Sequence, residues 1–410
     1  MRGSRLVSAV VAAALALVAA GCSTSGGGPA SSTTPAASPG GSASVPASTV
    51  PASSSTSTSP STTTATTRAC VSLASWSDER LAAETVIVPA DENDVTFAAP
   101  EVSAGAGGVV LFGASAPSDL GAQLASLQSS SPGDLGALVM TDEEGGGVQR
   151  MANLVGSLPW ANYMGQHWSP AEITSQVTTI ARNMASDGIS MDLAPVVDVD
   201  GRNVAPGASD PDGWRSFSGT TSVVSADGVA FMRGLEDGGV IPVLKHFPGL
   251  GGSSGNTDNG PAHTLAWSTL QKAAIPPFVA GIDAGAPAIM ISNAVVPGLS
   301  TLPASLSSAV VTGELVGTLH FNGLIITDSL SAGAISGAGF SVTQASVQAI
   351  RSGADMVMYT SEATSSASQQ QFRAIVSAEV SAVAHGEFPR SRLVAAAAAV
   401  LASRHLPVCG

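Results

Sequence analysis

Short apolar runs alternate with alanine-rich segments along the chain from Cys70 onward. The runs are rich in β-branched residues, which is typical of buried strands, and the segments between them are long enough to form crossover helices. Eight runs are predicted to be strands, over residues 84–89, 107–112, 137–141, 189–195, 240–245, 288–292, 324–327 and 354–359. Helices are predicted over residues 117–128, 170–186, 223–237, 269–284, 305–319 and 343–352. Eight βα units in about 340 residues predict an α/β fold made of a single (β/α)8 barrel.

Polar side chains stand where five of these strands end. They are Asp142, Asp198, the pair Lys245-His246, Asn293 and Asp328. In a closed barrel the carboxyl ends of all strands meet at one mouth, whereas in an open doubly wound sheet they lie along an edge. Periodicity alone leaves both architectures open. The polar residues favour the barrel and predict one shared site.

The first 22 residues are typical of a lipoprotein signal peptide. Arg2 and Arg5 precede an uncharged apolar run over residues 6–20, and Gly21 precedes Cys22. The run is too short to predict a membrane span. We therefore expect export and a lipid anchor on Cys22 that holds the protein at the extracytoplasmic face of the cell membrane, with a plain secretory signal as the alternative.

Residues 23–69 are predicted to be a disordered tether between this anchor and a folded domain over residues 70–410. The segment consists mainly of Ser, Thr, Pro, Ala and Gly, and no charged residue occurs between Ser23 and Thr67. Such a composition cannot bury a core. As a flexible coil the tether would span on the order of 40 Å.

Two cysteines, Cys70 and Cys409, stand at the two ends of the predicted domain. Export places them in an oxidising compartment, where we expect them to form a disulfide. The formal net charge is −14, and no basic stripe occurs, which argues against nucleic acid as a partner. We expect a monomer.

The predicted mouth combines carboxylates with cationic and imidazole groups. Its candidate residues are Asp142, Asp198, Asp258, Asp328, Arg150, Arg215, Lys245 and His246. Facing carboxylates surrounded by hydrogen-bond donors are what the hydrolysis of a glycosidic bond needs. A strand end with a satisfied core histidine is the simpler alternative for the Lys-His pair. Because Lys245 is one of only two lysines in the chain, its position at the end of a buried strand argues for a function and against a chance occurrence.

Other chemistries find little support in the sequence. It contains no HExxH motif, and GGSSG over residues 251–255, which has the spacing GxSxG, does not open a predicted helix as a nucleophile elbow does. The glycine-rich loop over residues 249–255 matches neither a Walker A motif nor GxGxxG. We therefore expect no metal and no organic cofactor.

Seven motifs of this chain resemble glycoside hydrolase family 3, specifically its single-domain β-N-acetylglucosaminidases. They are TDEEGGGVQR, MDLAPVVDVD, WRSFSG, KHFPGLG, IMISNAVVP, PASLSS and IITDSLSAGAI, and the resemblance extends from about residue 75 to residue 365. It implies that residues 70–410 form the family's N-terminal-type barrel domain and hydrolyse terminal β-linked N-acetylglucosamine from cell-wall-type glycans. It also implies that Asp328 is the nucleophile of a retaining mechanism. The residues implied to surround the sugar are Asp142, Arg150, Arg215, Lys245 and His246.

The chain departs from the family at the proton donor. The family carries Asp-Ser-His after KHFPG, with the histidine as acid/base, whereas this chain has Asn256-Thr257-Asp258. An arginine of the family is also replaced, by Gly147. Three explanations compete: Asp258 donates the proton, His263 swings in with Asp258 orienting it, or the protein binds glycans without cleaving them. Within the enzymes, a β-glucosidase or β-xylosidase is the alternative.

Overall fold

The computed structural model describes residues 70–360 and 365–409, so the predicted signal peptide, Cys22 and the predicted tether lie outside the described residues. Each of the eight predicted strands is present, with small shifts at its ends. The strands are β1 (Val86–Asp91), β2 (Gly108–Phe112), β3 (Leu138–Thr141), β6 (Met191–Asp192), β7 (Ile241–Phe247), β8 (Ala288–Ile291), β9 (Leu324–Thr327) and β10 (Val357–Met358).

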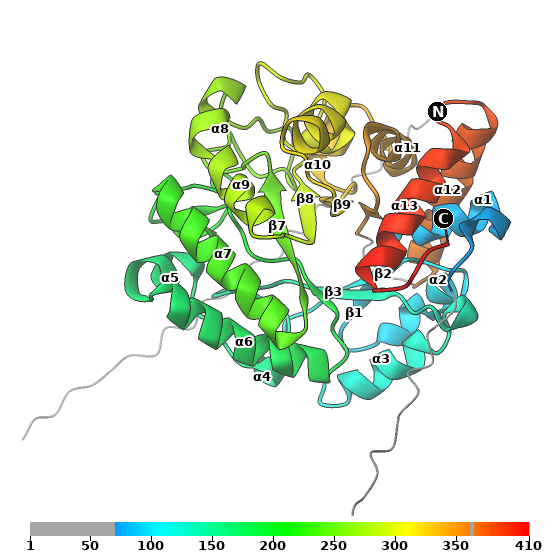
Figure 1. Ribbon diagram of the computed structural model, residues 1–410, viewed down its shortest axis with the longest axis horizontal. Coiled ribbons are helices and arrows are strands. Elements are labelled where there is room, and N and C mark those ends of the chain that lie inside the picture. Colours follow the sequence, from blue (N-terminus) through cyan, green and yellow to red (C-terminus); the bar gives the residue numbers. More distant parts are fainter. Residues whose placement is uncertain (1–69, 361–364, 410) are drawn as a thin grey trace, which may run out of the picture. The chain divides into compact units, whose positions relative to one another are not determined.

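The eight strands form a parallel barrel in the order β10-β1-β2-β3-β6-β7-β8-β9 (Figure 1). The two ends of this order meet, because Ile326 of β9 forms a parallel bridge with Met356, the residue before β10. The predicted barrel is therefore confirmed, and the alternative of an open sheet is wrong. An additional antiparallel hairpin, β4 (Glu143–Gly145) and β5 (Val148–Gln149), follows β3 directly.

Helices surround the barrel. They are α1 (Asp78–Glu84), α2 (Ala99–Ser103), α3 (Leu120–Gln128), α4 (Ala152–Val155), α5 (Ala161–His167), α6 (Pro170–Ser186), α7 (Thr221–Gly238), α8 (Trp267–Ala273), α9 (Ile275–Asp283), α10 (Gly333–Gly337), α11 (Val342–Ser352), α12 (Ser365–Ala384) and α13 (Arg390–Ser403). Of these, α3, α6, α7, α8, α9 and α11 lie where the sequence predicts helices, and the other seven were not predicted. A capping box of Ser341 and Gln344 begins α11, and Gly353 ends it in the left-handed region. These local signals explain why α11 falls within one residue of its predicted start.

Two helical predictions differ in detail from the structure. The helix predicted over residues 269–284 is divided at Ala274 into α8 and α9, because Pro276 lacks the N–H that a continuous helix requires. The helix predicted over residues 305–319 is a short 3₁₀ turn, Ala304–Leu306, followed by the π-helix Ala309–Thr318.

The core has an inner and an outer layer. Alternate strand residues fill the barrel, so that Ile87 packs with Val110 and Met140 inside, while Val86 and Val88 pack outward with the helices. This period of two is what parallel strands with both faces buried require. The strands are thereby fixed, and side chains at their carboxyl ends have a rigid base.

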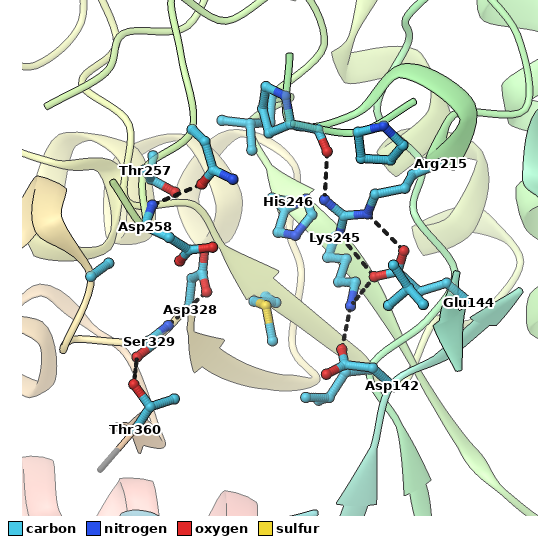
Figure 2. Close-up of a pocket in the computed structure, with 18 of the residues that line it drawn as sticks. Asp142, Glu144, Arg215, Lys245, His246, Thr257, Asp258, Asp328, Ser329 and Thr360 are labelled. Carbon is cyan, nitrogen blue, oxygen red and sulfur yellow. Dashed lines mark hydrogen bonds and ion pairs between the residues drawn. The ribbon is translucent and has the colours of Figure 1, made fainter. Parts of the chain in front are cut away.

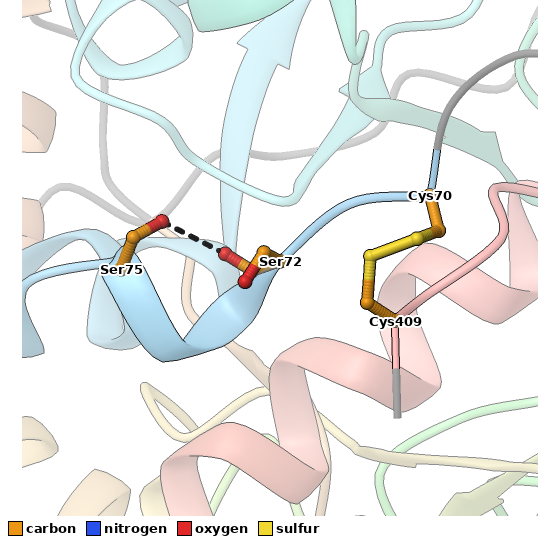
Figure 3. Close-up of a disulfide and its surroundings, with 4 residues drawn as sticks. All are labelled: Cys70, Ser72, Ser75 and Cys409. Carbon is orange, nitrogen blue, oxygen red and sulfur yellow. Dashed lines mark hydrogen bonds between the residues drawn. A yellow bond between two sulfur atoms is a disulfide. The ribbon is translucent and has the colours of Figure 1, made fainter.

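A disulfide joins the two ends of the described chain (Figure 3). Cys70 and Cys409 are bonded, as expected from the sequence, across 339 positions. Beside them Val71 pairs with Val408 in a parallel bridge. Among residues 70–360 and 365–409, no helix has the length and apolarity that crossing a bilayer requires.

Candidate active site

A cavity of about 460 Å³ opens at the carboxyl ends of the strands (Figure 2). Its lining includes Asp142 after β3, Lys245 and His246 at the end of β7, and Asp328 after β9. Arg150, Arg215 and Asp258 complete the set of predicted residues that line it. The barrel therefore brings together side chains that are nearly two hundred positions apart, as the positions of the strand ends predicted.

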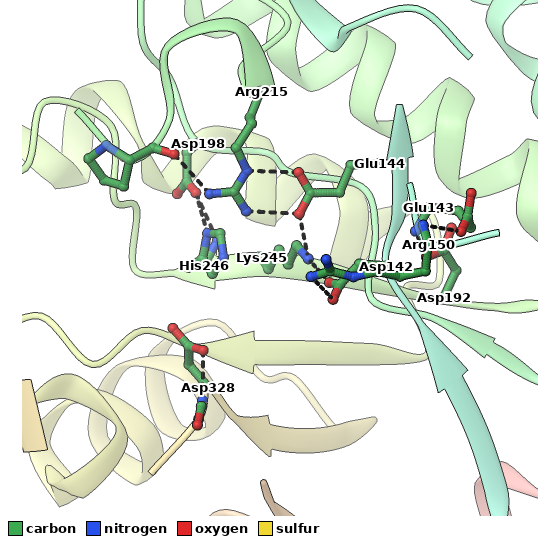
Figure 4. A network of polar contacts seen from close by, with 12 residues as sticks. Asp142, Glu143, Glu144, Arg150, Asp192, Asp198, Arg215, Lys245, His246 and Asp328 are labelled. Carbon is green, nitrogen blue, oxygen red and sulfur yellow. Dashed lines mark hydrogen bonds and ion pairs between the residues drawn. The ribbon is translucent and has the colours of Figure 1, made fainter. Parts of the chain in front are cut away.

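A network of buried ion pairs forms one wall of the cavity (Figure 4). Nζ of Lys245 lies 2.7 Å from Oδ1 of Asp142 and 2.7 Å from Oε1 of Glu144. Arg215 donates two parallel hydrogen bonds of 2.8 Å to Glu144. Burial alone raises the pKa of Glu144, but the charges of Arg215 and Lys245 outweigh burial and hold that pKa well below its usual range. The wall thus presents oriented charges with little freedom to move.

The two glutamates after Asp142 have different positions. Oε1 of Glu143 accepts the backbone N–H groups of Arg150 and Met151, both at 2.7 Å, and Oε2 accepts Nε2 of Gln149 at 2.9 Å. Burial raises the pKa of Glu143 to about 7. Glu143 therefore holds the β4–β5 hairpin together, whereas Glu144 lines the cavity.

Asp198 fixes the orientation of His246. Its Oδ2 accepts the backbone N–H of His246 at 3.1 Å and lies 2.7 Å from Nδ1 of the ring, and its Oδ1 accepts the N–H of Leu250 at 2.6 Å. Burial raises the pKa of Asp198 to about 7, whereas the N–H groups of Leu250 and His246 oppose that shift by favouring the ionised form. With Asp198 ionised, Nδ1 of His246 carries the ring proton and Nε2 is an acceptor. Burial, together with the charge of Arg215, lowers the pKa of His246 to about 4. The ring is therefore neutral at pH 7.

The carboxyl groups of Asp328 and Asp258 point toward each other on one side of the cavity, and the ion-pair network lies on the other side (Figure 2). Asp328 is half-buried, and its Oδ1 accepts the N–H of Ser329 at 2.6 Å. Burial raises the pKa of Asp328; His246 opposes this shift and the charge of Asp258 adds to it. Asp258 is exposed, and its N–H donates to Oδ1 of Asn256 at 2.8 Å. The two carboxylates thus occupy environments of different polarity.

His263 does not line the cavity. Its side chain is exposed, and its backbone pairs with Val295. The N–H of His263 donates to Oγ of Ser254 at 2.9 Å, and its carbonyl accepts the N–H of Ser254 at 2.9 Å. These contacts hold the backbone of His263 in place, at a position outside the lining of the cavity.

One buried acid near His246, Asp212, was not predicted from the sequence. Asp212 is fully buried, and its carboxylate oxygens accept no hydrogen bond from the described residues. Donor atoms of Asp198, Asp212 and His246 lie within 4.8 Å of one another, which is a spacing that a metal ion could bridge. Asp198, however, already accepts three N–H groups. The other acids were identified because they follow predicted strands. Asp212 does not follow a strand, so it could not be identified in that way.

Comparisons with known proteins agree on one family. Residues 100–402 match the N-terminal domain of glycosyl hydrolase family 3. Beta-hexosaminidase LpqI of Mycobacterium tuberculosis is 35% identical over 237 residues, which cover 55% of this chain and 59% of that protein. A beta-hexosaminidase of Xylella fastidiosa is 32% identical over 222 residues, which cover 52% of this chain and 64% of that protein. Each match therefore spans less than two thirds of the relative's length.

Solved structures match over a larger part of the chain. The β-N-acetylhexosaminidase of Beutenbergia cavernae superposes with a TM-score of 0.73 at 30% identity, covering 80% of this chain and 99% of that one. A glycosyl hydrolase of the same family from Mycobacterium smegmatis gives a TM-score of 0.71 at 31% identity, covering 80% and 98%.

Proposed function

This chain belongs to glycosyl hydrolase family 3, and from that premise we propose that it is a retaining β-N-acetylhexosaminidase. The proposed substrate is a glycan of cell-wall type that ends in β-linked N-acetylglucosamine. One observation carries the proposal: the carboxyl groups of Asp258 and Asp328 point toward each other in a cavity whose opposite wall is the ion-pair network of Lys245. Two relatives named beta-hexosaminidase and a structural neighbour named β-N-acetylhexosaminidase support the choice of this sugar.

The cavity suits the binding of one sugar ring. Its volume of about 460 Å³ lies within the range of ligand pockets. Asp142 and Arg150 supply an acceptor and a donor on one side, and Lys245 adds a buried ammonium group. Nε2 of His246 adds an acceptor for a hydroxyl group. These groups hold one another in place, so sugar hydroxyls would meet an organised surface.

The proposed reaction has two steps. Asp328, ionised, attacks the anomeric carbon and forms a glycosyl ester, while the bond to the leaving oxygen breaks and that oxygen takes a proton from Asp258. Asp258 then removes a proton from water, which attacks the anomeric carbon and releases Asp328. Two inversions give net retention, and the mechanism requires the two carboxyl groups to approach to about 5 Å.

Asp258 is the preferred proton donor because it lines the cavity and its carboxyl group points toward that of Asp328. His263 is the second candidate, and it is less favoured because its backbone is paired with Ser254 and Val295. The third explanation is that the protein binds glycans without cleaving them.

The test is hydrolysis of a panel of aryl glycosides. We expect turnover of the N-acetyl-β-glucosaminide well above that of the β-glucoside and β-xyloside, and none by Asp328→Ala. A fluorosugar inactivator should label the peptide that contains Asp328 in mass spectrometry. Faster hydrolysis of the glucoside or xyloside would show that the protein is a β-glucosidase or β-xylosidase instead. Sugar binding without turnover of any glycoside would show that it is a glycan-binding protein.

We also propose that the protein is exported, anchored by lipid on Cys22 and monomeric. The basic and apolar residues before Cys22 support the anchor. Radiolabelled fatty acid should be incorporated into the wild-type chain and not into Cys22→Ser. A single-species mass in sedimentation would check the oligomeric state.

A further inference from the structure

The loop that carries Asp258 rests on helix α10, which begins five residues after Asp328. The N–H of Gly333 donates to the carbonyl of Asp258 at 3.0 Å, and the N–H of Ala334 donates to the carbonyl of Thr257 at 2.9 Å. These hydrogen bonds join backbone to backbone. They therefore link the two proposed catalytic carboxylates through the main chain rather than through side-chain contacts.

Gly333 lets the loop come closer than any other residue would. A Cβ at position 333 would lie 2.7 Å from the carbonyl carbon of Asn259, 2.7 Å from the nitrogen of Gly260 and 2.9 Å from the carbonyl oxygen of Asp258. Non-bonded carbon contacts prefer about 3.5 Å or more, so a methyl group would require the backbones to separate by more than about half an ångström.

Gly337 extends the same close approach by one turn of the helix. A Cβ there would lie 2.5 Å from Cγ of Pro261. The face of α10 that carries Gly333 and Gly337 thus packs closely against residues 257–261. On its other side the loop is held by the N–H of Asn256, which donates to the carbonyl of Ala208 at 2.9 Å.

The chain between Asp328 and α10 is anchored to neighbouring strands. The N–H of Leu330 donates to the carbonyl of Met358 in β10 at 2.8 Å. Nδ2 of Asn293, after β8, donates to the carbonyl of Ser329 at 2.7 Å. Since this segment is fixed to the barrel, a side chain at position 333 would displace the Asp258 loop rather than Asp328.

We propose that Gly333 is a positioning residue that sets the separation between the carboxyl groups of Asp258 and Asp328. The proposal rests on the proposed function, in which Asp258 is the proton donor. Because a retaining site needs its carboxyl groups about 5 Å apart, the missing side chain fixes a distance on which the rate depends. A displacement of about 1 Å can lower a rate by about 10²-fold.

The experiment compares Gly333→Ala with Gly260→Ala. Gly260 lies on the same loop, but no atom lies within 4 Å of a Cβ placed there, so this variant adds a methyl group without a clash. For Gly333→Ala we expect kcat/KM to fall by about 10²-fold on substrates with poor leaving groups. Activated aryl glycosides, which need little protonation, should lose far less, and azide should restore their rate.

Two further measurements separate positioning from general damage. Amide exchange of residues 256–260 should be slow in the wild type and in Gly260→Ala, and faster in Gly333→Ala, with a small change in Tm. Gly337→Ala, whose Cβ meets only the ring of Pro261, should show a smaller effect in the same direction.

Three results would overturn the proposal. They are equal loss on both substrate classes with a large fall in Tm, unchanged kinetics in Gly333→Ala, and rapid exchange of the loop in the wild type. If the wild type hydrolyses no aryl glycoside, the proposed function fails, and the exchange of the loop alone decides whether Gly333 fixes it.

Discussion

At the scale of single residues, the proposed proton donor is Asp258, which is exposed at the edge of the cavity. We predict that Asp258→Asn lowers kcat/KM by about 10²- to 10⁴-fold on substrates with poor leaving groups, because proton transfer contributes about that much. Activated aryl glycosides should be affected little, and azide should increase their turnover.

The same measurements on His263→Ala decide between the two candidates. Because His263 is exposed and outside the cavity, its loss should change neither substrate class. If His263→Ala instead reproduces the leaving-group pattern and Asp258→Asn does not, the histidine is the donor and the loop must rearrange during the reaction.

The titration of Asp328 gives a second prediction at this scale. Asp328 must be ionised to attack, and burial together with the charge of Asp258 raises its pKa above the ordinary value of 3.8. Activity should therefore fall, as the pH is lowered, at a higher pH than for an ordinary aspartate. Asp258→Asn removes one negative neighbour, so the acidic limb of kcat/KM for an activated aryl glycoside should move to lower pH. A limb that stays in place or moves upward would show that the two carboxylates do not interact.

At the scale of elements, helix α12 contains a buried acid that links stability to pH. Oγ1 of Thr85 lies 2.8 Å from the carbonyl of Ala82 and 3.0 Å from Oε2 of Glu379. The hydroxyl has one proton and can donate to only one of these oxygens, so a protonated Glu379 supplies the second hydrogen bond. Burial raises the pKa of Glu379 to about 8.

This shift predicts how stability depends on pH. The unfolded chain releases the Glu379 proton near pH 4.5, whereas the folded chain keeps it to about pH 8. The free energy of unfolding should therefore fall as the pH rises between these values, by a few kcal/mol at most. Glu379→Gln does not titrate, so its Tm relative to the wild type should rise from pH 5 to pH 9. Parallel Tm curves for the two proteins would contradict a raised pKa.

Helices and strands could be predicted where the residues of the segment itself, without distant contacts, determine its structure. The strands could be found because both faces of each are buried, which leaves a continuous apolar run, and α11 because Ser341 and Gly353 mark its ends. The β4–β5 hairpin could not be found, since its strands are short and Glu143 and Glu144 are both acidic. Their division into a hairpin support and a cavity residue depends on contacts with Arg150 and Arg215, which no local pattern contains.

At the scale of the whole molecule, the barrel explains how much of the site the sequence contained. Strand order and closure bring all carboxyl ends to one mouth, so Asp142, Lys245 and Asp328 could be grouped from their positions alone. Asp212 could not, because it stands in a loop whose path depends on tertiary contacts. The close packing of the Asp258 loop against Gly333 could not be predicted either, since a glycine in a sequence does not reveal which backbone approaches it.

The disulfide gives the last prediction, because it closes nearly the whole domain into one loop. In the chain-entropy account the stabilisation grows slowly with loop length and reaches about 6 kcal/mol for a loop of several hundred residues. The double variant Cys70→Ser/Cys409→Ser should therefore lose about 10 °C in Tm. Its kcat/KM at 25 °C should be unchanged, since neither cysteine lines the cavity. Reductant should lower the Tm of the wild type to that of the variant and leave the variant unaffected. If reductant lowers both equally, the loss has another cause, and the ends of the domain are held by the Val71–Val408 bridge and its neighbours rather than by the covalent bond.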